Sequence, residues 1–318
     1  MPDAEANADA SVDGDANGDA ERRLGMGAGL AAYGLWGLFP LYFHALQPAG
    51  ALEILGHRIV WSFVLCLVVL GLRRQRGWIR VLRDDPGRAA AIVGAGLLLA
   101  TNWVTYVWAV NADRVIDASL GYFINPIITV VVGVVVLKES IRPLQRVAVA
   151  LGAISVVVLT LGYGEVPWIA LVLACTFAGY SFLKKQVQLP TVESLAAETM
   201  LLFPLALGGL VWLVARGESA FTSHGVWLDL KLIGLGIVTS IPLLLFGVAT
   251  RRIPLVMIGL LQYITPFGQL LLGWWWFGEQ MPPERWAGFV LIWAALAVLT
   301  TDALRASAGP NLGRTITT

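Results

Sequence analysis

The sequence predicts an all-α integral membrane protein in which ten transmembrane helices form two inverted five-helix repeats. Three observations support this prediction. Of the 318 residues, 57% are hydrophobic and only 14% are charged, whereas soluble domains are about one quarter charged. Ten apolar stretches are each long enough to cross a hydrocarbon core of about 30 Å. The sequence around residue 120 also recurs, in altered form, near residue 260.

The ten spans follow from the rule that about 20 apolar residues, rising about 1.5 Å each, cross a bilayer. The first five spans occupy residues 25–46, 51–72, 88–110, 115–137 and 143–162. After a short glycine-containing turn, the next five occupy residues 166–184, 192–215, 231–250, 254–277 and 283–303. Little chain remains between the spans, so we expect no separate soluble domain.

The internal repeat pairs the two halves of the chain at one constant offset. Four residues of the first half recur with the same identity and spacing in the second half, and a leucine keeps the same register: Pro126, Gly133, Glu139, Pro143 and Leu120 match Pro266, Gly273, Glu279, Pro283 and Leu260. Because each repeat has an odd number of spans, the second repeat (166–303) is inverted relative to the first (25–162). Inverted repeats with proline-interrupted helices are typical of secondary transporters, whose site lies between the repeats.

The basic residues predict the orientation in the membrane. With both termini in the cytoplasm, 17 of the 22 Lys and Arg residues fall on the inner side, and only Arg114, Arg216, Lys231 and Arg285 fall on the outer side. Cationic loops stay on the cytoplasmic side of a membrane. We therefore expect a multi-pass protein of the cytoplasmic membrane with both termini inside.

The two chain ends and the basic loop have simpler interpretations. Residues 1–24 form an acidic cytoplasmic tail that we expect to be disordered, because it is poor in large apolar residues. Residues 304–318 form a cytoplasmic C-terminal tail. The arginine-rich loop 73–88 lies beside a span, so it indicates orientation and contact with anionic lipid rather than a nucleic-acid site. The lipid bilayer is thus the expected large-scale partner, and the oligomeric state is left open.

Three charged or titratable residues open the second span and form one candidate group. Glu53 and His57 are four residues apart, hence on one helical face, and Arg58 follows directly. Ionisable groups inside a membrane are costly and need a partner or a role. One interpretation is a proton-responsive gate, because His titrates near neutral pH. The other is an ion-paired cluster that only fixes helix packing.

A second group of candidates lines a possible substrate pathway. Asn125 with Pro126, and Thr265 with Pro266, lie inside spans, where a proline frees a backbone carbonyl that can face a cavity. The alternative is a kink that only improves packing. The other candidates are aromatic or amide side chains of the same and neighbouring spans: Tyr33, Trp36, Asn102, Trp103, Tyr106, Tyr122, Gln262 and Tyr263. Aromatic walls with a few amides suit a neutral or zwitterionic small molecule.

The remaining charged residues are expected to pair with neighbours. Glu193 or Glu198 is placed to meet Lys184 or Lys185 across a short loop, and Asp117 is three residues from Arg114. The sequence has no zinc-binding, nucleophile-elbow or phosphate-loop motif. We therefore expect no catalytic residues, metal or cofactor, and no ATP-driven step.

The chain resembles the RarD branch of the drug/metabolite transporter superfamily, whose members are EamA-like transporters. The resemblance covers about residues 25–303 and rests on six short stretches: Ala32 to Pro40, Glu53 to Trp61, Asn102 with Trp103, Trp108 to Asn111, Ala118 to Pro126, and Gln262 to Pro266. It implies ten helices in two inverted EamA repeats, a cavity where the repeats meet, and export of a small molecule.

Together these observations predict a secondary carrier that exports a small organic metabolite or drug by alternating access. Two other functions stay open at this point. A membrane-embedded enzyme would need catalytic groups clustered at one depth, and only residues 53–58 come near that pattern. A non-transporting scaffold or sensor would keep its function when the central cavity is blocked.

Overall fold

The computed structural model describes residues 2–75, 77–136, 138, 140–187, 189–253, 257–258 and 261–308. Within these ranges the chain is all helical. The helices of the first half are α1 (Pro2–Gly37), α2 (Phe39–His44), α3 (Ala51–Leu72), α4 (Gly77–Asp84), α5 (Pro86–Asn111), α6 (Val115–Val136) and α7 (Pro143–Tyr163). Those of the second half are α8 (Trp168–Val187), α9 (Thr191–Arg216), α10 (Val226–Thr250), α12 (Ile264–Leu271), the π-helix η1 (Leu272–Trp276) and α13 (Pro283–Ala308).

Eight helical segments of the described chain are long and apolar enough to cross a membrane. They match eight of the ten predicted spans, and the sixth span corresponds to the shorter apolar segment Trp168–Lys184. The ninth predicted span, 254–277, includes residues outside the described ranges, and its described part holds the short helices α12 and η1. Two repeat positions, Glu139 and Leu260, also lie outside the described residues. The structure thus shows a multi-pass helical protein, and the count of ten stays a prediction.

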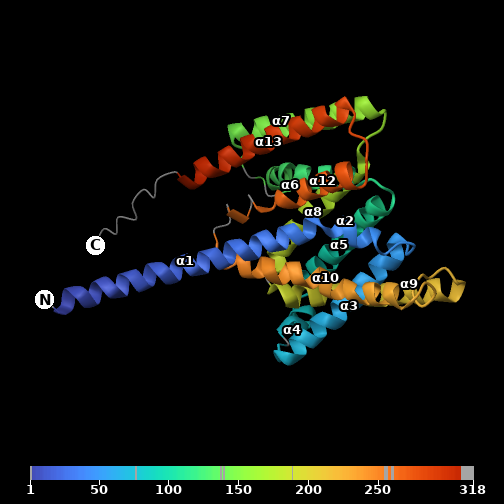
Figure 1. Ribbon diagram of the computed structural model, residues 1–318, viewed down its shortest axis with the longest axis horizontal. Helices are drawn as coiled ribbons and strands as arrows, with labels where there is room; N and C mark the ends of the chain where they lie inside the picture. Colours follow the sequence, from blue (N-terminus) through green and yellow to red (C-terminus); the bar gives the residue numbers. More distant parts are fainter. Residues whose placement is uncertain are drawn as a thin grey trace.

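Helix packing follows the pairing that two equivalent repeats require. By the repeat offset, α1 together with α2 is equivalent to α8, and α3 is equivalent to α9. In the same way, α5 is equivalent to α10, α6 to α12, and α7 to α13. Three equivalent pairs pack directly on each other: α3 on α9, α6 on α12, and α7 on α13. The packing of α5 on α8 is repeated by α10 on α1, and that of α3 on α10 by α9 on α5. Figure 1 shows α7 and α13 side by side in an outer layer beside α6 and α12.

The N-terminal segment and the basic loop differ from what the sequence predicts. The backbone is helical from Pro2, as part of α1, where the sequence predicts disorder up to residue 24. Alanine is the strongest helix former, and this segment is rich in it, which accounts for its local helical preference. Figure 1 shows the N-terminal part of α1 extending beyond the other helices. In the basic loop, helix α4 forms and buries Trp78 against the cluster that holds Leu195 of α9.

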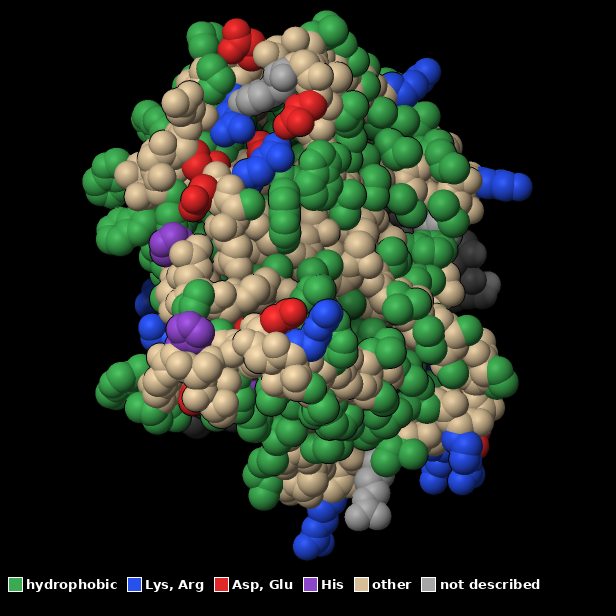
Figure 2. Space-filling view, turned by 90° about the vertical axis from the view of Figure 1, so that its right-hand side faces the viewer, with side chains coloured by type: hydrophobic (Ala, Val, Ile, Leu, Met, Phe, Trp, Pro, Cys, Tyr) green, Lys and Arg blue, Asp and Glu red, His purple; other side chains and the backbone are tan. Residues whose placement is uncertain are grey.

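The first residues of α1 and the last residues of α13 lie on the same side of the bundle (Figure 1). We call the opposite end the far end, which is formed by residues 45–50, 112–114, 164–167, 217–225 and 277–282. Figure 2 shows this end, where acidic, basic and histidine side chains lie among hydrophobic ones. Termini on one side are what an even number of membrane crossings produces.

Candidate functional site

Arg58 lies at the centre of the helices and is surrounded by aromatic rings. Its residue is only 5% exposed, and its Nε donates a hydrogen bond to Thr239 Oγ1 of α10 at 3.1 Å. The guanidinium carbon is 3.8 Å from the ring centroid of Trp103 in α5. It is also 5.6 Å and 5.5 Å from the ring centroids of Phe39 and Phe43 in α2. This side chain therefore joins helices of both repeats.

Two tyrosines and a glutamine complete this arrangement. The ring of Tyr106 lies 5.8 Å from that of Phe43 and 5.7 Å from that of Tyr122, between centroids. Gln269 of α12 donates from Nε2 to Tyr106 Oη at 2.9 Å and to the backbone oxygen of Trp36 at 3.3 Å. We call the whole set the central cluster: Phe39, Phe43, Arg58, Trp103, Tyr106, Tyr122, Thr239 and Gln269.

Several predicted pathway residues lie outside the central cluster. Asn102 joins α5 to α8, since its Nδ2 donates to Leu173 O and to Thr176 Oγ1, both at 3.0 Å. Tyr33 packs edge-on against Trp36, with centroids 5.3 Å apart, and against Phe246 of α10. Trp36 borders the central cluster through its backbone oxygen. The predicted set is thus divided between a site and the helix contacts around it.

The two matched prolines have different surroundings. Helix α6 continues through Pro126, and the neighbouring Asn125 Oδ1 is buried without a hydrogen-bond partner in the described part of the chain. In the second repeat, Gln262 and Tyr263 form a turn, and Pro266 lies in the first turn of α12. The interruption of helical structure expected in both repeats is therefore seen among the described residues only in the second.

Glu53 and His57 share a face of α3 but bond to different groups. The Glu53 carboxylate accepts from Ser219 Oγ at 2.6 Å and from the backbone N–H groups of Ala220 and Phe221, both at 3.1 Å. His57 Nδ1 accepts from Trp61 Nε1 at 3.1 Å, and its ring contacts Phe221. No ion pair joins Glu53, His57 and Arg58 among the described side chains. The three residues therefore do not form the single cluster that their spacing indicates.

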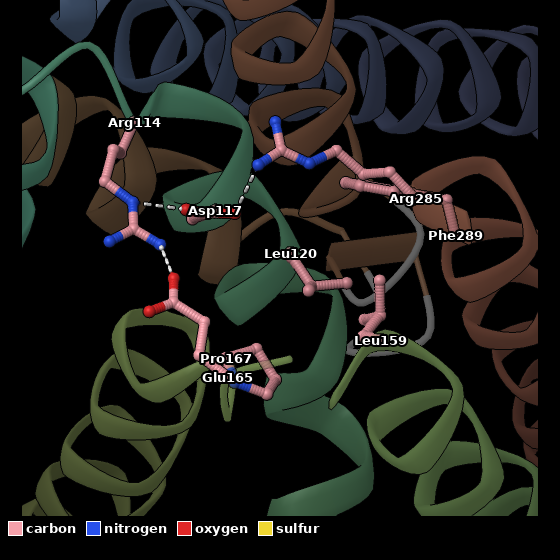
Figure 3. Close-up of a pocket in the computed structure, with 8 residues that line it drawn as sticks. All are labelled: Arg114, Asp117, Leu120, Leu159, Glu165, Pro167, Arg285 and Phe289. Atoms are coloured by element: carbon pink, nitrogen blue, oxygen red, sulfur yellow. Dashed lines mark hydrogen bonds and ion pairs between the residues drawn. The ribbon is translucent and has the colours of Figure 1, made fainter. Parts of the chain in front are cut away.

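A second group of charges connects helices at the far end of the bundle. Asp117 at the start of α6 accepts from Arg114 at 2.7 Å and from Arg285 of α13 at 3.2 Å. Arg114 also pairs with Glu165 at 3.1 Å, and Arg285 lies 3.9 Å from Glu279. Figure 3 shows Arg114, Asp117, Glu165 and Arg285 around a small cavity of about 20 Å³, close to the volume of one water. We call these five residues the far-end charge network.

Glu279 closes this network against the N-terminus of α6. Its two carboxylate oxygens accept from the backbone N–H groups of Val115 and Ile116. These are among the donors that a helix leaves unsatisfied at its N-terminus. Burial nevertheless dominates and raises the pKa of Glu279 to about 7. Its protonation state therefore changes near neutral pH, at a point where α6 meets α13.

The predicted ion pairs are confirmed in two places. Asp117 pairs with Arg114 as expected. Lys184 Nζ lies 2.6 Å from Glu198 Oε1, and Ser194 Oγ donates to the same oxygen at 2.8 Å. Glu198 is thus the acid that pairs with Lys184, and the side chain of Lys185 lies outside the described part of the chain.

A comparison with known families decides what kind of protein this is. The model of the EamA-like transporter family matches residues 23–161 and again residues 166–301. The chain belongs to the EamA-like transporter family. The two matches coincide with the two halves of the fold and leave out only the chain ends and the turn before α8.

Relatives place the chain within the RarD type of EamA-like transporters. It is 52% identical over 90% of its length to the protein RarD of Streptomyces exfoliatus, of which it covers 90%. An uncharacterized transporter of Pseudomonas aeruginosa is 43% identical over 90% of the length of this chain and 96% of its own length. RarD of Escherichia coli is 37% identical over 89% of this chain and 96% of its own. A solved crystal structure with 19% identity aligns with a TM-score of 0.59 over 88% of this chain and 99% of its own, so it shares the fold.

Sequence reasoning missed four members of the central cluster in this EamA-like protein. Gln269 lies seven residues after Gln262 and three after Pro266, so helical spacing could have placed it on the same face. Phe39 and Phe43 lie in the short helix α2, which was expected to be the end of the first span. Thr239 is 181 residues from its partner Arg58, and no local pattern identifies such a contact.

Proposed function

We propose that this EamA-like transporter is a secondary carrier that exports a small organic metabolite or drug across the cytoplasmic membrane. The observation that supports the proposal is the central cluster itself. It places a buried cation, two phenols and an amide among helices from both repeats. Polar groups at membrane depth between repeats are typical of a transport site.

Alternating access would require the contacts at the far end of the bundle to open. The far-end charge network ties α6 to α13 and to Glu165 in the loop before α8, so it holds that end closed. Breaking these contacts would allow the two repeats to rock about the central cluster. The turn at Gln262 and Tyr263, before Pro266, provides a place where the second repeat can bend. With cytoplasmic termini, the far end faces the outside of the cell.

A proton gradient is the proposed energy source, with His57 as the coupling residue. Neutral imidazole accepts at Nδ1 from Trp61, and protonation would remove that acceptor. Protonation of His57 would therefore alter its contact with Phe221, whose ring centroid lies 4.8 Å from that of the imidazole. The loop held by Glu53 would then shift at the far end of α3.

Efflux from proteoliposomes tests the proposal directly. Vesicles containing the purified protein are loaded with a mixed panel of metabolites and drugs, and the released solutes are identified by mass spectrometry, with and without a pH gradient. We expect release of a subset that requires the protein and is faster with the gradient. Release of no solute would favour a scaffold or sensor, and conversion of a solute into a product would favour an enzyme.

A further inference from the structure

We propose that the transported solute carries a carboxylate and that Arg58 binds it. The inference rests on the function proposed above, because it names the class of solute for the same site. It goes against the neutral or zwitterionic solute that the aromatic residues alone indicate.

Arg58 has no carboxylate partner within 4.0 Å among the described residues. Every other contact given for its guanidinium is with the Thr239 hydroxyl or with an aromatic ring. Ring faces attract a desolvated cation, but more weakly than the cost of burying an unpaired ion. The rings therefore offset only part of the cost, and an anion would offset the rest.

At the equivalent position of the second repeat, the protein itself neutralises the buried charge. At the repeat offset of Pro126 and Pro266, Arg58 corresponds to Glu198. Glu198 is 0% exposed, and Lys184 neutralises it at 2.6 Å while Ser194 and Tyr180 donate hydrogen bonds to it. The protein thus supplies a counter-ion in one repeat and leaves the described surroundings of the other without one. This asymmetry is expected if the transported solute supplies the counter-ion of Arg58 while it is bound.

The available donors match a carboxylate. With Nε bonded to Thr239, the two Nη groups of Arg58 keep the parallel N–H bonds that recognise carboxylates in bidentate fashion. Tyr106 Oη accepts from Gln269, so its own hydrogen can be donated to an anion. Trp103 and Phe43 provide apolar walls beside the cation. An organic acid with an apolar or aromatic body fits this environment better than a hydrated inorganic anion.

Gln269 adds a second requirement on the solute, a hydrogen-bond donor. Its Oε1 is buried and has no hydrogen-bond partner within the described chain. A buried acceptor left without a donor destabilises the protein, because it has lost its bond to water. A hydroxyl or amino group on the solute would satisfy it. The preferred solute is therefore an aromatic or apolar acid that also carries a hydrogen-bond donor.

The test uses pairs of probes that differ only in charge. Phenylacetate, 4-hydroxyphenylacetate and mandelate are each compared with their neutral amides, by calorimetric binding to the purified full-length protein in detergent. We expect the acids to bind at least about tenfold more tightly than the amides. Arg58→Gln should remove that preference, and Arg58→Lys should retain part of it. The control is Arg216→Gln, because Arg216 also lies over a ring, that of Trp212, but is on the surface.

Each result decides the inference, separately from the proposed function. Equal binding of acids and amides by the native protein, or no binding of any acid, overturns it whether or not the variants fold. An unchanged preference in folded Arg58→Gln protein also overturns it. If the acids bind through Arg58 but leave proteoliposomes no faster than from protein-free vesicles, the carboxylate site stands and the transport function fails.

Discussion

The buried charges of α3 depend on residues far away in the chain, whereas the buried acids Asp117 and Glu198 pair with cations 3 and 14 residues away. Glu53 is held by the loop between α9 and α10, Arg58 by Thr239 of α10, and Glu198 by Lys184 of α8. Helical spacing correctly placed Glu53 and His57 on one face, but it could not identify partners more than 160 residues away. The sequence therefore predicts which residues need partners, whereas only the fold decides which partners they receive.

The first prediction concerns Glu53. Replacing it with glutamine should lower the free energy of unfolding by roughly 2–4 kcal/mol, because an amide NH₂ would face N–H groups that now donate to a carboxylate. Thermal unfolding in detergent measures the effect. Glu218→Gln is the matched control, since Glu218 lies close by in the chain and its side chain is 53% exposed. Equal losses in the two variants would show that the bonds to Glu53 contribute little.

The second prediction concerns His57 as the proposed proton-coupling residue. His57→Ala should flatten the pH dependence of efflux between about pH 5 and 8, where an ordinary histidine titrates. Trp61→Phe is a useful companion, because it removes the hydrogen bond to Nδ1 and leaves the imidazole in place. It should shift the pH profile rather than abolish it. Identical profiles for the native protein and His57→Ala would exclude coupling at this residue.

At the scale of helices, hydropathy predicts most of the fold because the bilayer imposes one length on every span. Predicted and observed boundaries agree within a few residues for α3, α5, α6, α7 and α9. Helix α4 is short and polar on one side, so hydropathy did not predict it, and the break between α1 and α2 within the first span was not predicted either. In the ninth span, the described residues form a turn at Gln262 and the two short helices α12 and η1, a break that hydropathy does not predict.

Close helix crossings rely on glycine where two repeats meet. A Cβ at Gly236 of α10 would lie 2.5 Å from the backbone oxygen of Trp61 in α3, which is too close for any side chain. At Gly34 of α1, nothing lies within 4 Å of the same atom. Small residues at such crossings let helix backbones approach in a membrane.

The third prediction follows from this difference between the two glycines. Gly236→Ala should separate α10 from α3 and lower the unfolding temperature in detergent by several degrees, as about 1–3 kcal/mol of overpacking would do. Gly34→Ala should be neutral or slightly stabilising, because alanine is the better helix former. Since Thr239 lies on α10, Gly236→Ala should also weaken binding of acids at Arg58. Equal stability of the two variants would mean that the crossing can relax without cost.

At the scale of the whole molecule, ion pairs join helices at both ends of the bundle, as Arg142 with Asp302 and Arg252 with Glu21 do at the end that holds the termini. The far end has a continuous charge network that links α6, α13 and the loop before α8. The sequence predicts only one of its pairs, Arg114 with Asp117, because the other members come from distant parts of the chain. Glu279 matched Glu139 in the repeat pattern, but its place at the start of α6 was not foreseen.

The fourth prediction concerns pH and the far end. Because the native pKa of Glu279 is about 7, above the ordinary carboxyl value of 4.5, the closed protein binds a proton that an open or unfolded chain releases. This contribution to stability is fully present below about pH 4.5 and is lost as the pH rises through about 7. Glu279→Gln should therefore reduce the fall in unfolding temperature across that interval. Glu284→Gln, which changes an exposed acid nearby, should leave the fall unchanged.

The fifth prediction tests whether the far end must open during transport. In a protein with Cys66 and Cys175 replaced by serine, Asp117→Cys and Arg285→Cys are joined by a reducible bifunctional thiol reagent. The link connects α6 to α13 where the native side chains pair at 3.2 Å. Efflux should stop after crosslinking and return after reduction, since the repeats could no longer rock apart. Transport rates in the same proteoliposome preparation, before and after reduction, measure this.

The control pair for this experiment lies on one element. Arg114→Cys with Asp117→Cys removes the same kinds of charge, and its link spans three residues at the start of α6. Such a link ties no helix to another, so efflux should continue after crosslinking. If both linked pairs transport equally well, the far end does not open, and alternating access about the central cluster is wrong. If both stop, the reagent itself blocks the pathway, and a shorter reagent distinguishes obstruction from restraint.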